Sequence, residues 1–246
     1  MSRPADWTPL AAADPVPGDP VEVARVGRRL QQVADQISAD VSWLRSLCTS
    51  RFWDSGAGRE FHGQVDDAAA RLARTHDRYL AAALALGSGL SGAGYAGALD
   101  RAQSLSLRAL TQAQRAWSAM RAQLATAAAA NEGCPPYAGT PPLTRLPAQP
   151  RLDSSGNPVP LVAPAGADPR LSDAVARYNA SALEYRAASG RLADAIALRD
   201  EAAARATALI QAAIAADGLQ DRTGLWHDIT ATVSGDTRRH DRKQCG

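Results

Sequence analysis

Apolar residues recur at steps of three and four along three long stretches of the chain. In the first stretch they fall on one side of a helix, whereas charged residues such as Arg28 and Asp35 fall off it. This spacing is typical of an amphipathic helix and predicts one over residues 20–49. Its apolar positions are Val23, Val26, Leu30, Val33, Ile37, Val41, Leu44 and Leu47.

The second stretch predicts a helix over residues 56–130, because no proline interrupts the chain from Gly56 to Cys134. A cluster of glycines weakens its pattern, since each glycine costs up to about 1 kcal/mol relative to alanine in a helix. We interpret this cluster either as a hinge or as a helix-packing seam, where backbones approach closely. It consists of Gly87, Gly89, Gly92, Gly94 and Gly97.

Capping residues and prolines set the boundaries of these stretches. Asp19 precedes Pro20, and Asp168 precedes Pro169, so a preferred N-cap residue stands before a preferred first helical residue in both places. Prolines exclude helix elsewhere. The expected organisation is an extended segment over 1–18, a helical hairpin domain over 19–134, a Pro-rich linker over 135–168, a C-terminal helix over 169–219, and a short amphipathic piece with a polar tail over 220–246.

Composition supports an all-α fold. Alanine, the best helix former, makes up roughly a fifth of the 246 residues. Aromatic residues make up only 5%, whereas sheets favour aromatic and β-branched residues. We expect an elongated antiparallel helical hairpin or bundle of long Ala-rich helices. The first helix would fold back on the first half of the second, and the third helix on its other half.

Charge and cysteine content exclude several classes of protein. The net charge is +2 and the pI is about 8.6, without the basic stripe of dedicated nucleic-acid binders, so nucleic acid is disfavoured as a partner. Cys48, Cys134 and Cys245 are far apart and form neither a disulfide framework nor a C-x-x-C site. The N-terminus lacks the continuous apolar segment of a Sec-type signal peptide.

No arrangement of residues predicts catalysis. His62 and His76 are separated by about 21 Å along a helix, which is too far for them to share a metal. The adjacent His–Asp pairs at 227–228 and 240–241 are of a kind that arises often by chance. The glycine cluster lacks the Lys and Ser/Thr of a P-loop. We therefore expect a protein that is not an enzyme, with no catalytic residue, metal site or cofactor.

The nine residues WDSGAGREF, from Trp53 to Phe61, predict a turn between two antiparallel helices. Asp54 or Ser55 would cap the second helix, and the small residues that follow let the chain reverse. The spacing alone fits equally well a packed helical hairpin without further function. The residues of this turn motif are Trp53, Ser55, Gly56, Ala57 and Phe61.

With its surroundings, this turn resembles the signal domain of type VII secretion substrates, the Trp-x-Gly helical-hairpin superfamily that includes leaders of polymorphic toxins. The resemblance covers about residues 10–130, and Trp53, Ala57 and Phe61 match its turn positions. It implies recognition by the type VII machinery and by a homo- or heterodimeric helical partner. It also implies Sec-independent export from the cytoplasm to the cell envelope or medium, without catalysis.

Three features depart from the family pattern. Ser55 stands where the family has glycine, and Gly56 comes one place late. The secretion motif, a tyrosine followed four residues later by an acidic residue, is missing, since Asp100 lies five residues after Tyr95. The sequence also ends where a toxin domain would be expected to begin, which suggests a leader whose toxin is lost or separately encoded.

Two alternatives remain open beside export. One is a helical scaffold of the cytosol or envelope with no role in secretion. The other, less favoured, is conditional membrane insertion through 79–99, an uncharged segment of the length that spans a bilayer. Its content of alanine, glycine and serine makes insertion marginal.

Overall fold

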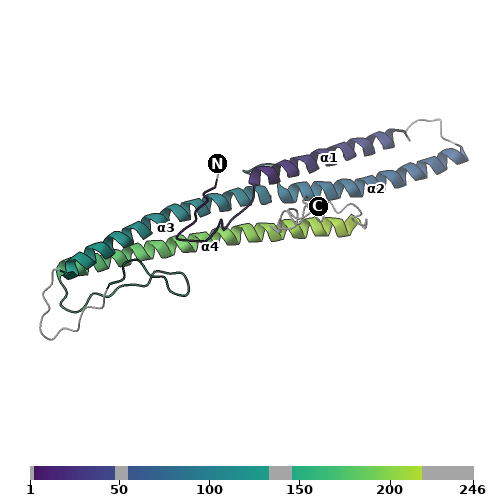
Figure 1. Ribbon diagram of the computed structural model, residues 1–246. Helices are drawn as coiled ribbons and strands as arrows, with labels where there is room; N and C mark the ends of the chain where they lie inside the picture. Colours follow the sequence, from purple (N-terminus) through teal and green to yellow (C-terminus); the bar gives the residue numbers. More distant parts are fainter. Residues whose placement is uncertain (1–2, 48–54, 133–145, 218–246) are drawn as a thin grey trace, which may run out of the picture. The chain divides into compact units, whose positions relative to one another are not determined.

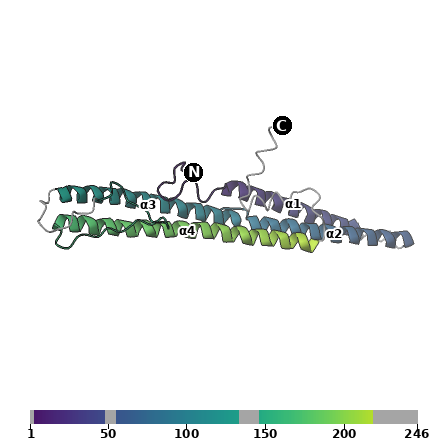
Figure 2. The same cartoon turned by 60° about the horizontal axis from the view of Figure 1, so that its bottom comes forward.

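A computed structural model describes residues 3–47, 55–132 and 146–217 (Figures 1 and 2). Within these residues the chain forms four α-helices and no strand, which confirms the predicted all-α fold. The helices are α1 (Pro20–Leu47), α2 (Gly56–Leu86), α3 (Tyr95–Glu132) and α4 (Pro169–Asp217). The chain divides into two units: unit 1 comprises Met1–Val16 and Gln103–Ile196, and unit 2 comprises Pro17–Ala102 and Ala197–Gly246.

Helices α1 and α4 begin at the predicted prolines, and an aspartate caps each. The Asp19 carboxylate accepts hydrogen bonds from the backbone N–H of Val21 at 2.9 Å and of Glu22 at 3.2 Å. The Asp168 carboxylate accepts one from the N–H of Arg170 at 2.7 Å. These bonds satisfy first-turn donors that have no partner inside a helix, which explains why both helices start there.

The single helix expected over 56–130 is wrong, because residues 87–94 interrupt it and separate α2 from α3. Gly87 ends α2 with a φ of 81°, a conformation that L side chains rarely adopt. Its N–H still donates to the carbonyl of Ala83 at 2.8 Å. The glycine cluster therefore interrupts the predicted helix.

Unit 2 contains an antiparallel pair formed by α1 and α2, which lie side by side in both views (Figures 1 and 2). Gly27, near the start of α1, lies against Gly87 at the end of α2. The predicted apolar face of α1 is only partly covered, because Val33 and Leu47 remain exposed. The buried apolar residues of the two helices include Val23, Leu30, Ala34, Val41, Val65 and Ala69.

In unit 1, α3 packs along α4 through small residues and two tyrosines (Figure 2). The rings of Trp117 and Tyr185 lie 5.8 Å apart, centroid to centroid, at an angle of 47°. Alanines at the contact let the helix backbones come close. The buried core of this pair, here called the α3–α4 core, consists of Ala113, Ala116, Met120, Leu124, Tyr178, Ala182, Tyr185 and Ala188.

The described part of the predicted linker, residues 146–168, contains no helix and packs within unit 1. Residues 151–159 form a small hairpin with an antiparallel bridge between Leu152 and Pro158. Leu161 packs against the α3–α4 core and against a second cluster built around Ala127 and Leu171. This part of the linker therefore contributes to the core of unit 1.

Candidate functional site

The turn motif is described from Ser55 onward, and Trp53 lies outside the described residues. The hydroxyl of Ser55 accepts a hydrogen bond from the N–H of Gly58 at 3.1 Å and is the N-cap of α2, so Ser55 rather than Asp54 caps this helix. Gly56 and Ala57 are exposed, and Phe61 is half-buried. A Cβ at Gly56 would meet no atom within 4 Å.

Four of the five seam glycines take part in close contacts. A Cβ on Gly94 would lie 2.4 Å from the amide nitrogen of Gly87, and a Cβ on Gly97 would lie 2.4 Å from the carbonyl oxygen of Gly92. Real Cβ atoms do not come so close to backbone atoms. A Cβ on Gly89 would meet no atom within 4 Å, and a Cβ on Gly92 would make only ordinary contact with the carbonyl oxygen of Gly89, at 3.6 Å. The tight part of the seam is thus the turn that joins α2 to α3.

Gly27 belongs to this seam, although the sequence analysis did not single it out. A Cβ there would lie 2.2 Å from the carbonyl oxygen of Gly87. The neighbouring Arg28 donates a hydrogen bond to the carbonyl of Ser88 at 2.8 Å, which satisfies a backbone group freed by the break. A lone glycine inside an apolar helical stripe is the signal that could have identified it.

Large apolar side chains are exposed on the hairpin of unit 2. The exposed fraction is 62% for Trp43 on α1 and 66% for Leu84 on α2. Val33 and Leu47 add further apolar surface on α1. Exposed aromatic and aliphatic groups of this kind are suited to contact with another protein, although single ones are common on surfaces.

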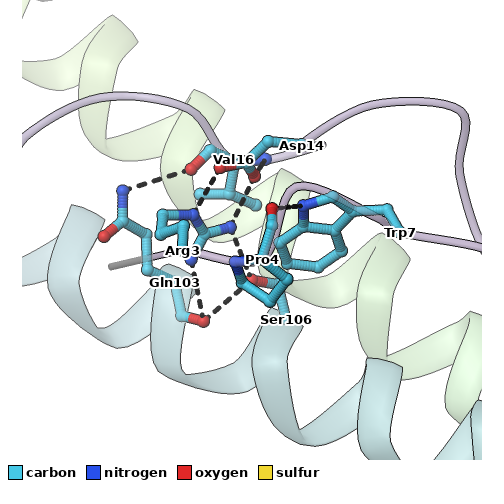
Figure 3. A network of polar contacts seen from close by, with 7 residues as sticks. All are labelled: Arg3, Pro4, Trp7, Asp14, Val16, Gln103 and Ser106. Atoms are coloured by element: carbon cyan, nitrogen blue, oxygen red, sulfur yellow. Dashed lines mark hydrogen bonds and ion pairs between the residues drawn. The ribbon is translucent and has the colours of Figure 1, made fainter. Parts of the chain in front are cut away.

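A network of hydrogen bonds and an ion pair joins the N-terminal segment, residues 3–16, to α3 (Figure 3). Arg3 forms an ion pair with Asp14, and it donates to the hydroxyl of Ser106 at 3.2 Å and the carbonyl of Gln103 at 3.4 Å. The side-chain amide of Gln103 in turn donates to the carbonyl of Val16 at 3.2 Å. Both ends of the segment are therefore bonded to the same stretch of α3.

Trp7 anchors the same segment. Only 1% of its surface is exposed, and its indole N–H donates to the carbonyl of Pro4 at 3.0 Å. The Arg3 guanidinium carbon lies 4.8 Å from the ring centroid of Trp7, a cation–π contact (Figure 3). The interpretation of residues 1–18 as simply extended missed this packing, because a single tryptophan among prolines has no periodic signal.

The described residues contain no group of three or more His, Cys, Asp or Glu side chains placed to hold a metal ion. His76 is paired with its neighbour, with 2.9 Å between its Nδ1 atom and an oxygen of Asp77. The three cysteines and the adjacent His–Asp pairs at 227–228 and 240–241 lie outside the described residues.

Among the described residues, none of the helices has both the length and the apolar character needed to cross a membrane. The segment 79–99 is divided between α2, the glycine break and α3.

Comparison with protein-family models, with curated proteins and with solved structures finds no match to this chain.

Proposed function

We propose that residues 19–134 are a non-catalytic targeting domain of a type VII secretion substrate, which acts through recognition of its helices and export. The α1–α2 hairpin carries the proposal. Two long helices run antiparallel, meet closely at Gly27 and Gly87, and are joined by the segment that holds the WDSGAGREF motif. Ser55, which belongs to this motif, is the N-cap of α2.

The surface of the hairpin supports recognition by a helical partner. Trp43 and Leu84 expose most of their apolar side chains on the two helices. Aromatic and large aliphatic groups of this kind often carry much of the binding free energy of an interface. In this proposal the partner is a helical protein or a second copy, and the type VII machinery recognises the assembled helices.

The alternative is a helical scaffold without a role in secretion, and one observation favours it. The C-terminal part of α4 belongs to unit 2, and its residues Ala202, Ala206 and Ile210 are buried there. A secretion leader should tolerate removal of α4, whereas an integrated scaffold should lose its fold.

Secretion tests the proposal directly. The tagged full chain and its Trp53→Ala variant are expressed in a GC-rich Gram-positive host, with and without the type VII motor ATPase and together with neighbouring genes. We expect the wild-type chain in the medium only when the ATPase is present, and several-fold less of the variant at equal cellular levels. Retention of the wild-type chain in all strains would contradict export and favour the scaffold.

A matched pair of leucine variants tests the role of the hairpin surface. Leu84→Ala on α2 and Leu183→Ala on α4 remove the same side chain at positions where 66% and 62% of it are exposed. We expect Leu84→Ala to reduce export and Leu183→Ala to leave it unchanged. Equal effects of the two variants would contradict recognition through the hairpin.

A further inference from the structure

Helix α4 holds two non-helical segments of unit 1 by their backbones. Asn179 binds both polar groups of Leu161, accepting from its N–H and donating to its carbonyl, each at 2.9 Å. The Tyr185 hydroxyl donates to the carbonyl of Pro9 at 2.9 Å. The Tyr178 hydroxyl donates to the carbonyl of Val159 at 3.3 Å, and the Arg186 guanidinium donates to the carbonyl of Pro158 at 3.1 Å. Such bonds recognise a chain that leaves its carbonyls free, as proline-containing segments do.

The same face offers apolar and aromatic contact. Leu10 of the N-terminal segment and Leu161 of the linker both pack against the α3–α4 core, as does Trp117. The ring of Tyr185 packs against that of Trp117, and the Tyr185 hydroxyl donates to the carbonyl of Pro9. Aromatic grooves with such donors are a recurring way to bind proline-containing peptides.

The N-terminal segment has the features of a preorganised ligand. Its Arg3–Asp14 ion pair, the stacking of Arg3 on Trp7 and the bond from Trp7 to Pro4 all lie within the segment. A peptide that holds its own shape loses less conformational entropy when it binds. The side chains of Trp7 and Val16 are buried, and the segment contacts the helices through Leu10 and through polar bonds to α3 and α4.

We propose that the α3–α4 face of unit 1 is a binding site for a looped, proline-containing peptide with a buried tryptophan, and that residues 3–16 are its intramolecular ligand. The face binds the same sequence in trans when the attached copy is weakened. Attachment raises the effective concentration of the segment to about millimolar, which excludes free peptide from the wild-type chain. This site uses no residue of the α1–α2 hairpin, which carries the export proposal, although α3 also lies within residues 19–134.

The first test measures binding of a fluorescently labelled peptide of residues 1–18 to full-length chains by fluorescence anisotropy. We expect the Trp7→Ala chain to bind it at least tenfold more tightly than the wild-type chain does. Trp43→Ala, which removes an exposed tryptophan from unit 2, is the matched control and should behave like the wild type. A labelled peptide with Trp7→Ala should not bind any of these chains.

A second substitution locates the site. Adding Tyr185→Phe to the Trp7→Ala chain removes the hydroxyl that binds the Pro9 carbonyl, so binding of the wild-type peptide should weaken several-fold. A Trp7→Ala chain that keeps the helical circular dichroism of the wild type but binds no peptide would overturn the proposal.

If Trp7→Ala impairs folding, cleavage of the native chain tests whether the α3–α4 face binds the N-terminal segment. A protease site inserted between Pro17 and Gly18, which are exposed, allows the N-terminal peptide to be cut after the full chain has folded. We expect the cut peptide to co-elute with the remaining chain in gel filtration and to exchange with labelled peptide. Separate elution, with the helical signal of the remaining chain unchanged, would overturn the proposal.

Discussion

At the scale of single residues, glycine determines how closely α1 approaches the end of α2. The atom that a Cβ on Gly27 would meet is the carbonyl oxygen of Gly87, a backbone atom that no change of rotamer can move away. Gly87 itself has a positive φ of 81°, and a Cβ there would lie 3.1 Å from the Cα of Gly94. The contact between α1 and the end of α2 therefore requires glycine at both positions, 27 and 87.

Gly27→Ala should lower the free energy of unfolding by about 1–3 kcal/mol, the usual cost of overpacking, less the gain in helix propensity of up to about 1 kcal/mol. Gly63→Ala in α2 is the control, because a Cβ there would meet no atom within 4 Å. This control should stabilise the chain by up to about 1 kcal/mol. Denaturant unfolding followed by far-UV circular dichroism measures both, and equal stabilisation would contradict the close contact.

At the scale of the helices, the elements whose causes are local could be predicted from the sequence. Asp19, Ser55 and Asp168 cap α1, α2 and α4, and each cap acts on amide groups only two or three residues away. The packing of the N-terminal segment could not be predicted in this way. Arg3 bonds to Ser106, 103 residues further along the chain, and periodicity carries no information at that distance.

In the candidate site, too, features with local causes could be predicted, whereas contacts between residues far apart in the sequence could not. The sequence identified the glycine cluster but not its contact with Gly27, because that contact comes from another helix. Within the turn motif, Ser55 caps α2 and the residues that follow it form the first turns of this helix. The carbonyl-binding side chains of α4 passed unnoticed, since Tyr178 and Tyr185 also fit the apolar stripe of a helix.

The cap of α4 gives a prediction at this scale. Asp168→Ala should lower the free energy of unfolding by about 1 kcal/mol, because the N–H of Arg170 loses its acceptor, and Asp168→Asn should restore most of it. Asp173→Ala is the control, since the exposed ion pair of Asp173 with Arg177, at 3.3 Å, is worth about 0–1 kcal/mol. Faster hydrogen exchange in the first turn of α4 should accompany Asp168→Ala alone; unchanged exchange there would show that the cap does not hold this turn.

At the scale of the whole molecule, buried tyrosines in both units link stability to alkaline pH. Burial raises the pKa of Tyr178 and Tyr185 in unit 1 above the ordinary value of 10.0. Burial is also the main cause of the raised pKa of Tyr95 in unit 2, where Asp200 adds to the rise and Arg199 opposes it. Each folded unit therefore favours the neutral phenol.

The sign of the effect follows from proton binding. Above pH 10 the unfolded chain releases its tyrosine protons more readily than the folded chain does, so the unfolded state gains stability as pH rises. The contribution of these tyrosines is fully present below the unfolded pKa of about 10 and is lost as pH increases through the higher folded pKa. We expect the melting temperature to fall above about pH 10, together with the appearance of tyrosinate absorbance.

Tyr185→Phe separates this linkage from the hydrogen bond that the hydroxyl makes. At pH 8 the variant should be about 1 kcal/mol less stable, because the carbonyl of Pro9 loses its donor. Above pH 10 its stability should fall less steeply than that of the wild type, since one titrating group is gone. Thermal melts from pH 8 to pH 11 measure both effects, and an unchanged alkaline slope would mean that Tyr185 ionises no less readily in the folded chain than in the unfolded one.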